Sequence, residues 1–274
     1  MRDAVKGGLL LLVMAALAGC RLDRRTPAPP AVVASADPPA DHPLRADILR
    51  GRGILEATAE SLPGYVGNAL RCTSCHLDGG TTEVLGWKGA YAHYPQYRSR
   101  ADRIQTIEDR INDCLQRSLN GRALPADASA MKSMVAYLAW LAKDEPVSGG
   151  LAGAGKLTAP VDTFRPDSAR GATLFLAECA RCHGPDGQGT AAAPPVWGPR
   201  SFNIGAGMAR YRTAAAFILA NMPRDRAGSL TPQQAVDVGA FIDSHPRPDL
   251  AGKEHDWPRG DAPKDTPYRT TSAP

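Results

Sequence analysis

Apolar residues return at helical spacing in several segments of this chain. Between Ala101 and Leu119 they recur at intervals of three and four residues, which is typical of an amphipathic helix. Similar apolar runs predict helices over Ser129–Lys143 and Thr213–Asn221. A last helix is expected to start with Pro232, because proline is well tolerated in a first helical turn. The pattern therefore predicts compact helical pieces joined by loops.

The chain also contains two similar halves. A Cys-x-x-Cys-His motif occurs at residues 72–76 and again at residues 179–183, each time with a helical segment downstream. Upstream of the two motifs, Arg52-Gly53 is matched with Arg170-Gly171. Each half is thus expected to run as helix, motif, long loop and helix.

The N-terminus has the features of an export signal. Arg2 and Lys6 precede an apolar stretch from Leu9 to Ala18, and Leu-Ala-Gly then leads directly into Cys20. This order predicts a bacterial lipoprotein signal, with acyl chains on Cys20 that anchor the protein to a membrane on its periplasmic side. The alternative is a plain secretory signal, which would release a soluble periplasmic protein.

Composition shifts set the remaining boundaries. Proline and alanine dominate the stretch after Cys20, and a Gly-rich linker separates the two halves. Prolines recur in the tail, which is expected to be an irregular strap or disordered. The expected plan is a signal peptide over 1–19, a lipidated tether over 20–43, domain 1 over 44–143, a linker over 144–165, domain 2 over 160–246 and a Pro-rich tail over 247–274.

Composition excludes several functional classes. The 274 residues carry a net charge of +4, from 32 Lys and Arg against 28 Asp and Glu, which is too balanced for a nucleic-acid binder. No apolar run reaches the about 18 residues of a membrane span. Hydrophobic residues make up 43% of the chain but aromatic residues only 6%, with 27 glycines and 24 prolines. These values favour helical domains with long Gly/Pro loops over a sheet-rich enzyme.

The repeated motif is the attachment pattern of c-type haem. Two thiols bond to the porphyrin edge, and the adjacent histidine supplies one axial ligand to the iron. A zinc knuckle would need four pooled ligands, and a thioredoxin-like dithiol does not require the histidine. The sequence thus predicts an all-α protein of two class I cytochrome c-like domains in tandem, each with one covalently bound haem c. The attachment residues are Cys72, Cys75, His76, Cys179, Cys182 and His183.

The second axial ligand must be found separately for each iron. In the second half Met222 lies just before the last helix, where monohaem cytochromes c place a thioether ligand, so His183 and Met222 are the expected pair. Met208 is a competitor, and simple core packing is the alternative for Met222.

In the first half no methionine occupies the equivalent place. Met131 and Met134 fall inside a helix and are expected to be core residues, while His93 lies in a Tyr/Pro-rich loop. Cys114 is the one cysteine that neither the haems nor the lipid anchor use.

Helical spacing places Cys114 in a row with two polar residues. Arg110 and Ser118 lie four residues to either side, on the same helix face. A guanidinium one turn away favours the thiolate form of cysteine. The alternative is that Cys114 is a buried small hydrophobic residue beside a solvated arginine.

These segments resemble the dihaem thiosulfate dehydrogenases, or tetrathionate synthases. The likeness is carried by Tyr97–Arg100, by Asp109–Gly121 with its central cysteine, and by the Trp197–Met208 loop, and it extends over most of residues 45–245. It implies that His76 and Cys114 ligate the first iron, which forms the active site, and that the second haem passes electrons onward. It also implies substrate contacts from Arg100, Arg110 and Ser118, with Arg103 near the same face. Some family members have lysine before the methionine; here Asn221 stands there, which implies His/Met ligation in both redox states.

The resemblance also implies the reaction. Two thiosulfates are oxidised to one tetrathionate and two electrons, which leave through the second haem to an external cytochrome c; the reverse reaction is also open. A covalent adduct between Cys114 and thiosulfate is the implied intermediate. The competing functions are a dihaem electron carrier without its own substrate, and a sulfur-oxidation (SoxA-like) cytochrome that acts on a carrier protein; a dihaem peroxidase is disfavoured by the length of the chain.

Overall fold

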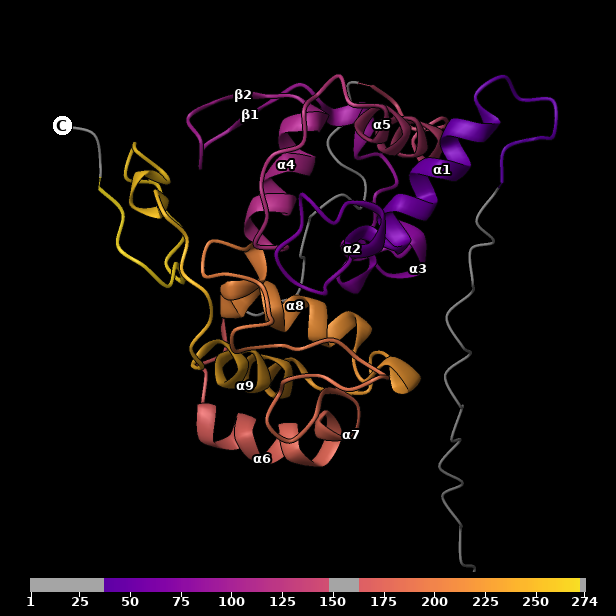
Figure 1. Cartoon of the computed structure of the whole chain (residues 1–274). Helices are drawn as coiled ribbons and strands as arrows, with labels where there is room; N and C mark the ends of the chain where they lie inside the picture. Colours follow the sequence, from indigo (N-terminus) through magenta and orange to yellow (C-terminus); the bar gives the residue numbers. More distant parts are fainter. Residues whose placement is uncertain (1–36, 148–162, 272–274) are drawn as a thin grey trace, which may run out of the picture. The chain divides into compact units, whose positions relative to one another are not determined.

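The computed structural model describes residues 37–147 and 163–271 (Figure 1). The expected signal peptide, Cys20 and most of the expected tether lie outside the described residues, as does the central part of the linker. Among the helices described, none is both long and apolar enough to cross a membrane.

The first half is built on two crossing helices. Helix α1 (Arg45–Glu56) packs along α5 (Ser129–Leu141), and a Cβ on Gly51 would lie only 1.9 Å from the backbone oxygen of Ser133. Only glycine permits so close an approach of the two backbones. Three further helices, α2 (Thr58–Ser61), α3 (Leu77–Gly80) and α4 (Ile107–Arg117), complete this half.

The second half repeats the crossing. Helix α6 (Ser168–Glu178) packs along α9 (Pro232–Asp243), and a Cβ on Gly171 would lie 2.0 Å from the backbone oxygen of Asp237. Helix α8 (Tyr211–Asn221) packs on the same α9, and α7 (Ala180–His183), which follows directly after Cys179, carries Cys182 and His183 of the second Cys-x-x-Cys-His motif. Gly51 is therefore the residue of the first half that is structurally equivalent to Gly171. The sequence match of Gly171 with Gly53 was wrong, because a Cβ on Gly53 would meet nothing within 4 Å.

The predicted amphipathic helix is shorter than expected. Residues Arg103–Gln105 form strand β2, which pairs antiparallel with β1 (Gln96–Arg98), so the helical prediction from Ala101 was wrong. Helix α4 begins only after Thr106, because Thr106 and Asp109 form a capping box: the Thr106 hydroxyl accepts from Asp109 N at 3.3 Å, and the Thr106 N–H donates to Asp109 Oδ2 at 3.0 Å. The other helical predictions are confirmed, including the last helix that starts with Pro232.

Each half has its own hydrophobic core. The first includes Met131 and Met134, both 0% exposed, which confirms their expected role in packing. The second is centred on Phe175 and Trp197. Met208 packs against both cores. Short 3₁₀ turns cover Cys72–Ser74, Tyr91–His93, Gly207–Ala209, Arg224–Arg226 and Lys253–His255.

Polar contacts join the second half to the end of α4. Asn203 donates from Nδ2 to Gln116 O at 2.9 Å and from its backbone N–H to Arg117 O at 3.1 Å. Asn68 Nδ2 donates to both Ser118 O, at 3.0 Å, and Ser201 O, at 3.3 Å. The helix that carries Cys114 is thereby fixed between the two halves.

Residues 246–271 form an irregular segment after α9, which we call the C-terminal strap. Its only helical turn is Lys253–His255, yet Asp256 and Trp257 are buried, at 6% and 4% exposure. The strap, drawn in yellow in Figure 1, extends from α9 toward the β1–β2 hairpin, where Trp257 N donates to Arg100 O at 2.9 Å.

Candidate functional site

The first Cys-x-x-Cys-His motif is held by its neighbours in a form suited to haem. Thr58 Oγ1 accepts from Cys72 N at 3.0 Å and lies 3.4 Å from Cys72 Sγ. The Nδ1 atom of His76 lies 2.5 Å from the carbonyl oxygen of Leu85, to which Nδ1–H donates. This bond fixes the ring and leaves Nε2 to bind a metal. Burial lowers the pKa of His76 to about 4, so the imidazole is neutral, as a metal ligand must be.

Cys114 lies with this motif. The pKa of both Cys72 and Cys75 is raised to about 12, chiefly by burial and in part by the nearby Cys114 sulfur, which places the three sulfurs in one electrostatic neighbourhood. Cys72, Cys75 and Cys114 are each partly buried, and none of the three is in a disulfide. The motif supplies two sulfurs and a neutral imidazole, and α4 adds a third sulfur, which together suit a covalently attached haem with two axial ligands.

Arg110 reaches Cys114 along the helix, as the spacing predicts. Its Nη1 lies 3.1 Å from Cys114 Sγ, close enough for a hydrogen bond to sulfur. The pKa of Arg110 is raised, chiefly by Coulomb attraction from that sulfur. The contact places a fixed positive charge beside the Cys114 sulfur.

Tyr94 is a neighbour that the sequence did not indicate. Burial raises the pKa of its hydroxyl, and Arg110 and Cys114 both act on it electrostatically. The sequence offered only a Tyr/Pro-rich loop, in which His93 rather than Tyr94 was considered. Its place beside Arg110 depends on the fold of that loop.

The structure places the other three candidates differently. Ser118 is the C-cap of α4, and its backbone N–H donates to Cys114 O at 2.8 Å. Arg103 is paired with Asp109 at 3.3 Å and is 56% exposed.

Arg100 lies in the turn between β1 and β2, where its Nη1 donates to Gly205 O at 2.7 Å and its guanidinium lies 4.5 Å from the Trp257 ring centroid. Burial lowers the pKa of Arg100 to about 10, and the neighbouring Arg117 contributes to the decrease.

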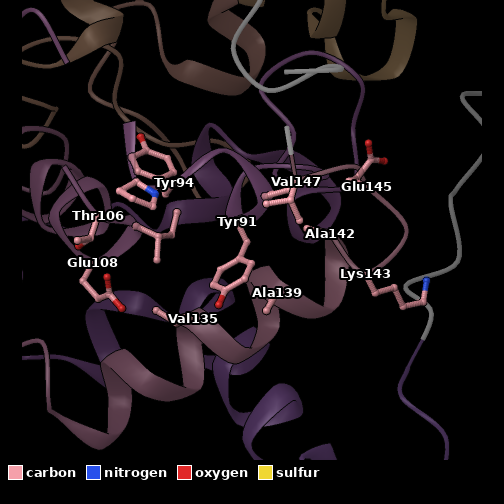
Figure 2. A pocket seen from close by; sticks show the side chains of 13 residues that line it. Tyr91, Tyr94, Thr106, Glu108, Val135, Ala139, Ala142, Lys143, Glu145 and Val147 are labelled. Atoms are coloured by element: carbon pink, nitrogen blue, oxygen red, sulfur yellow. The ribbon is translucent and has the colours of Figure 1, made fainter. Parts of the chain in front are cut away.

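A cavity of about 520 Å³ lies on the first half, between the Tyr91–His93 turn, the start of α4 and α5 (Figure 2). Tyr91, Tyr94 and Val135 line it, and Glu108 and Glu145 make its rim partly acidic. No residue of the Cys-x-x-Cys-His motif lines it, so this cavity is not the haem attachment site.

The second motif has the same local design. His183 Nδ1 lies 2.8 Å from Pro194 O, which again leaves Nε2 for a metal. Met222 follows the last residue of α8 and packs, like Cys179, against the second core. Asn221 is buried, and its Nδ2 donates to Phe217 O at 3.2 Å.

The zinc interpretation has no support in the geometry. Within residues 37–147 and 163–271, no three His, Cys, Asp or Glu side chains are grouped as a metal-ion site requires. His76 and His183 instead belong to separate halves, and each directly follows the second cysteine of its own pair.

Comparison with family models assigns both halves. Residues 66–147 match the SoxA/TsdA cytochrome c domain, and residues 168–246 match the cytochrome c domain. The predicted fold class, two cytochrome c domains in tandem, is thereby confirmed, and the two covalently bound haem c groups are the cofactors of these domains.

Individual relatives narrow the assignment. The chain is 44% identical to a thiosulfate dehydrogenase of Psychrobacter arcticus, over 82% of this chain and 71% of that protein. It is 45% identical to one of Allochromatium vinosum, over 76% of this chain and 81% of that protein. The identity to the SoxA subunit of an L-cysteine S-thiosulfotransferase from Hydrogenobacter thermophilus is 30%, over 50% of this chain.

A solved structure agrees with these relatives. Thiosulfate dehydrogenase (TsdBA) from Marichromatium purpuratum superposes with a TM-score of 0.72 at 35% identity. The match covers 79% of this chain, and this chain spans 50% of that one. Sequence, domain order and fold lead to one assignment: the chain belongs to the thiosulfate dehydrogenase family of cytochromes c.

Proposed function

We propose that this protein oxidises two thiosulfates to one tetrathionate at Cys114 and passes the two electrons to an external cytochrome c. The observation that carries the proposal is the 3.1 Å contact between Arg110 Nη1 and Cys114 Sγ, beside the first haem attachment motif. It combines a nucleophilic sulfur with a fixed positive charge, and thiosulfate is a dianion that needs such a charge.

The chemistry can be written on the chain's own sulfur. The Cys114 thiolate bonds to the sulfane sulfur of one thiosulfate and gives a Cys–S–S–SO₃⁻ adduct, with loss of two electrons. A second thiosulfate attacks that sulfane sulfur, the cysteine thiolate leaves, and tetrathionate is formed. Atoms and charges balance: two S₂O₃²⁻ give one S₄O₆²⁻ and two electrons. The two haems, when bound, supply two one-electron acceptors for this oxidation.

The axial ligands are part of the proposal. Before substrate binds, His76 Nε2 and Cys114 Sγ would hold the first iron, and the Cys114 sulfur would leave the iron to bond with thiosulfate. His183 Nε2 and Met222 Sδ would hold the second iron. Met222 is preferred to Met208 because it packs against the second core only, as Cys179 does, whereas Met208 packs against both cores. With this ligation, the thiolate of Cys114 would give the first haem a lower potential than the thioether of Met222 would give the second, so the second haem would be the better electron acceptor.

The cellular setting is likewise proposed. We infer export, acylation of Cys20 and attachment to a bacterial membrane on the periplasmic side, on the strength of the N-terminal sequence.

Replacement of the cysteine tests the function. In Cys114→Gly we expect thiosulfate-dependent ferricyanide reduction to fall by at least about a thousandfold, because the nucleophile is lost. The matched control is Lys132→Ala, a change at an exposed position of α5, which should keep full turnover. Both proteins should retain two haems by pyridine haemochrome analysis. Undiminished turnover in Cys114→Gly would exclude the mechanism.

The SoxA match gives the second candidate a specific basis. A SoxA-like protein would transfer the thiosulfate sulfur to a cysteine on a partner. Purified protein alone, with thiosulfate and ferricyanide, distinguishes the two functions: turnover without any added protein supports thiosulfate dehydrogenase, and turnover only with a thiol-bearing carrier supports the alternative.

A further inference from the structure

The C-terminal strap returns to the first half of the molecule at the turn that carries Arg100. Trp257 N donates to Arg100 O at 2.9 Å, and Arg259 Nε pairs with Asp102 Oδ1 at 2.6 Å in the same turn. The residues that contact Arg100 from the strap lie outside both matched cytochrome c domains, which end at residues 147 and 246. The strap is therefore an addition to the two domains.

Two residues of the strap, Asp256 and Trp257, contact the Arg100 guanidinium. One face of the guanidinium lies 4.5 Å from the Trp257 ring centroid, within the range of a cation–π interaction. Its Nε lies 4.0 Å from Asp256 Oδ2, and its Nη1 donates to Gly205 O at 2.7 Å. With an exposed fraction of 20%, this side chain is held on several sides, while these contacts leave the Nη2 donors for an oxyanion.

Asp256 is the centre of this arrangement. It accepts two 2.8 Å hydrogen bonds from Arg117 and one of 2.6 Å from Tyr268 Oη, and its side chain is 8% exposed. Arg117 lies on α4 one turn after Cys114, so a single buried carboxylate links the Cys114 helix, the Arg100 turn and the strap. A bidentate arginine–carboxylate pair has a fixed geometry, which makes it suited to positioning its neighbours.

We propose that Asp256 and Trp257 are positioning residues of the thiosulfate site: they hold Arg100 in the orientation in which it binds a sulfonate group of the substrate. The inference rests on the proposed function and on the substrate contact of Arg100 that the resemblance to the thiosulfate dehydrogenases implies. The inference makes the strap part of the thiosulfate site. It predicts that the strap affects the affinity for substrate and not the chemical step.

The test measures kcat and KM for thiosulfate in full-length, haem-loaded protein. We expect Asp256→Asn and Trp257→Leu to raise KM roughly tenfold with little change in kcat, because a mobile Arg100 binds substrate more weakly without altering Cys114. Trp257→Phe keeps an aromatic face and should restore most of the affinity. Glu254→Gln, a change on the strap at a 49% exposed side chain, is the matched control and should behave as wild type.

A double variant separates positioning from general damage. If Asp256 acts through Arg100, then Asp256→Asn should add almost nothing to the KM of Arg100→Ala. An equal rise of KM in both backgrounds would overturn the inference, as would a KM within twofold of wild type in both Asp256→Asn and Trp257→Leu. If Asp256→Asn does not fold with two haems, the Trp257→Leu and Trp257→Phe pair decides alone. A wild-type protein without thiosulfate turnover would instead refute the proposed function.

Discussion

At the residue scale, the feature that decides the chemistry is a guanidinium beside a thiol. Arg110 Nη1 lies 3.1 Å from Cys114 Sγ on one face of α4. The sequence could predict this contact, because residues four apart in a helix lie on the same face. Tyr94, Asp256 and Trp257 could not be found in this way, since each approaches the site from a segment distant in sequence.

Substitution of Arg110 tests its role as an anion partner. We expect Arg110→Ala to raise the KM for thiosulfate by about 10- to 100-fold, the effect of losing a hydrogen bond to a charged group at about 1.5–3 kcal/mol. Haem content should stay at two, because Arg110 takes no part in attachment. Steady-state kinetics checks the prediction, and unchanged KM and kcat would remove Arg110 from the site.

At the scale of elements, α4 is set by its first turn. The capping box of Thr106 and Asp109 ends strand β2 and starts the helix, and the apolar periodicity alone did not reveal this boundary. Hydrophobic spacing continues through Ile104 and Ile107, but Ile104 is 68% exposed and pairs in the strand with Tyr97. The residue at which a helix begins thus depends on its N-cap as well as on its apolar face.

The capping box also makes a prediction about pH. The pKa of Asp109 is lowered in the folded protein, chiefly by its hydrogen bond from the Thr106 backbone and also by Arg103. A lowered pKa means that the folded state binds fewer protons than the unfolded chain, so the stabilisation is present above the ordinary aspartate pKa of about 3.9 and is lost as the pH falls through the folded value.

Asp109→Asn should therefore lower the free energy of unfolding at pH 7 by about 0.5 kcal/mol, a modest amount because the exposed charge is screened. Denaturant titrations of the haem-loaded protein at several pH values measure the difference from wild type. It should shrink toward zero below about pH 3.9. Glu108→Gln, in the same helical turn but outside the box, is the control. A difference that is constant with pH would contradict the assignment.

At the scale of the whole molecule, two haem domains could be read from the repeated motif, because haem attachment requires a fixed local spacing. The two halves also share a close helix crossing, at Gly51 in the first half and at Gly171 in the second. The β1–β2 hairpin and the course of the strap were not predictable, since short strands and irregular segments depend on partners rather than on periodicity. Asp256 illustrates this: nothing in its local sequence distinguishes it from the other acidic residues of the tail.

The central claim is that the Cys114 sulfur reaches the iron of the first haem. Electron paramagnetic resonance of the oxidised, haem-loaded protein tests it most directly, with wild type and Cys114→Gly compared at equal haem content. We predict two distinct low-spin ferric signals in the wild type, and selective loss of the thiolate-ligated signal in the variant while the second remains. Two signals that are unchanged in Cys114→Gly would contradict the account.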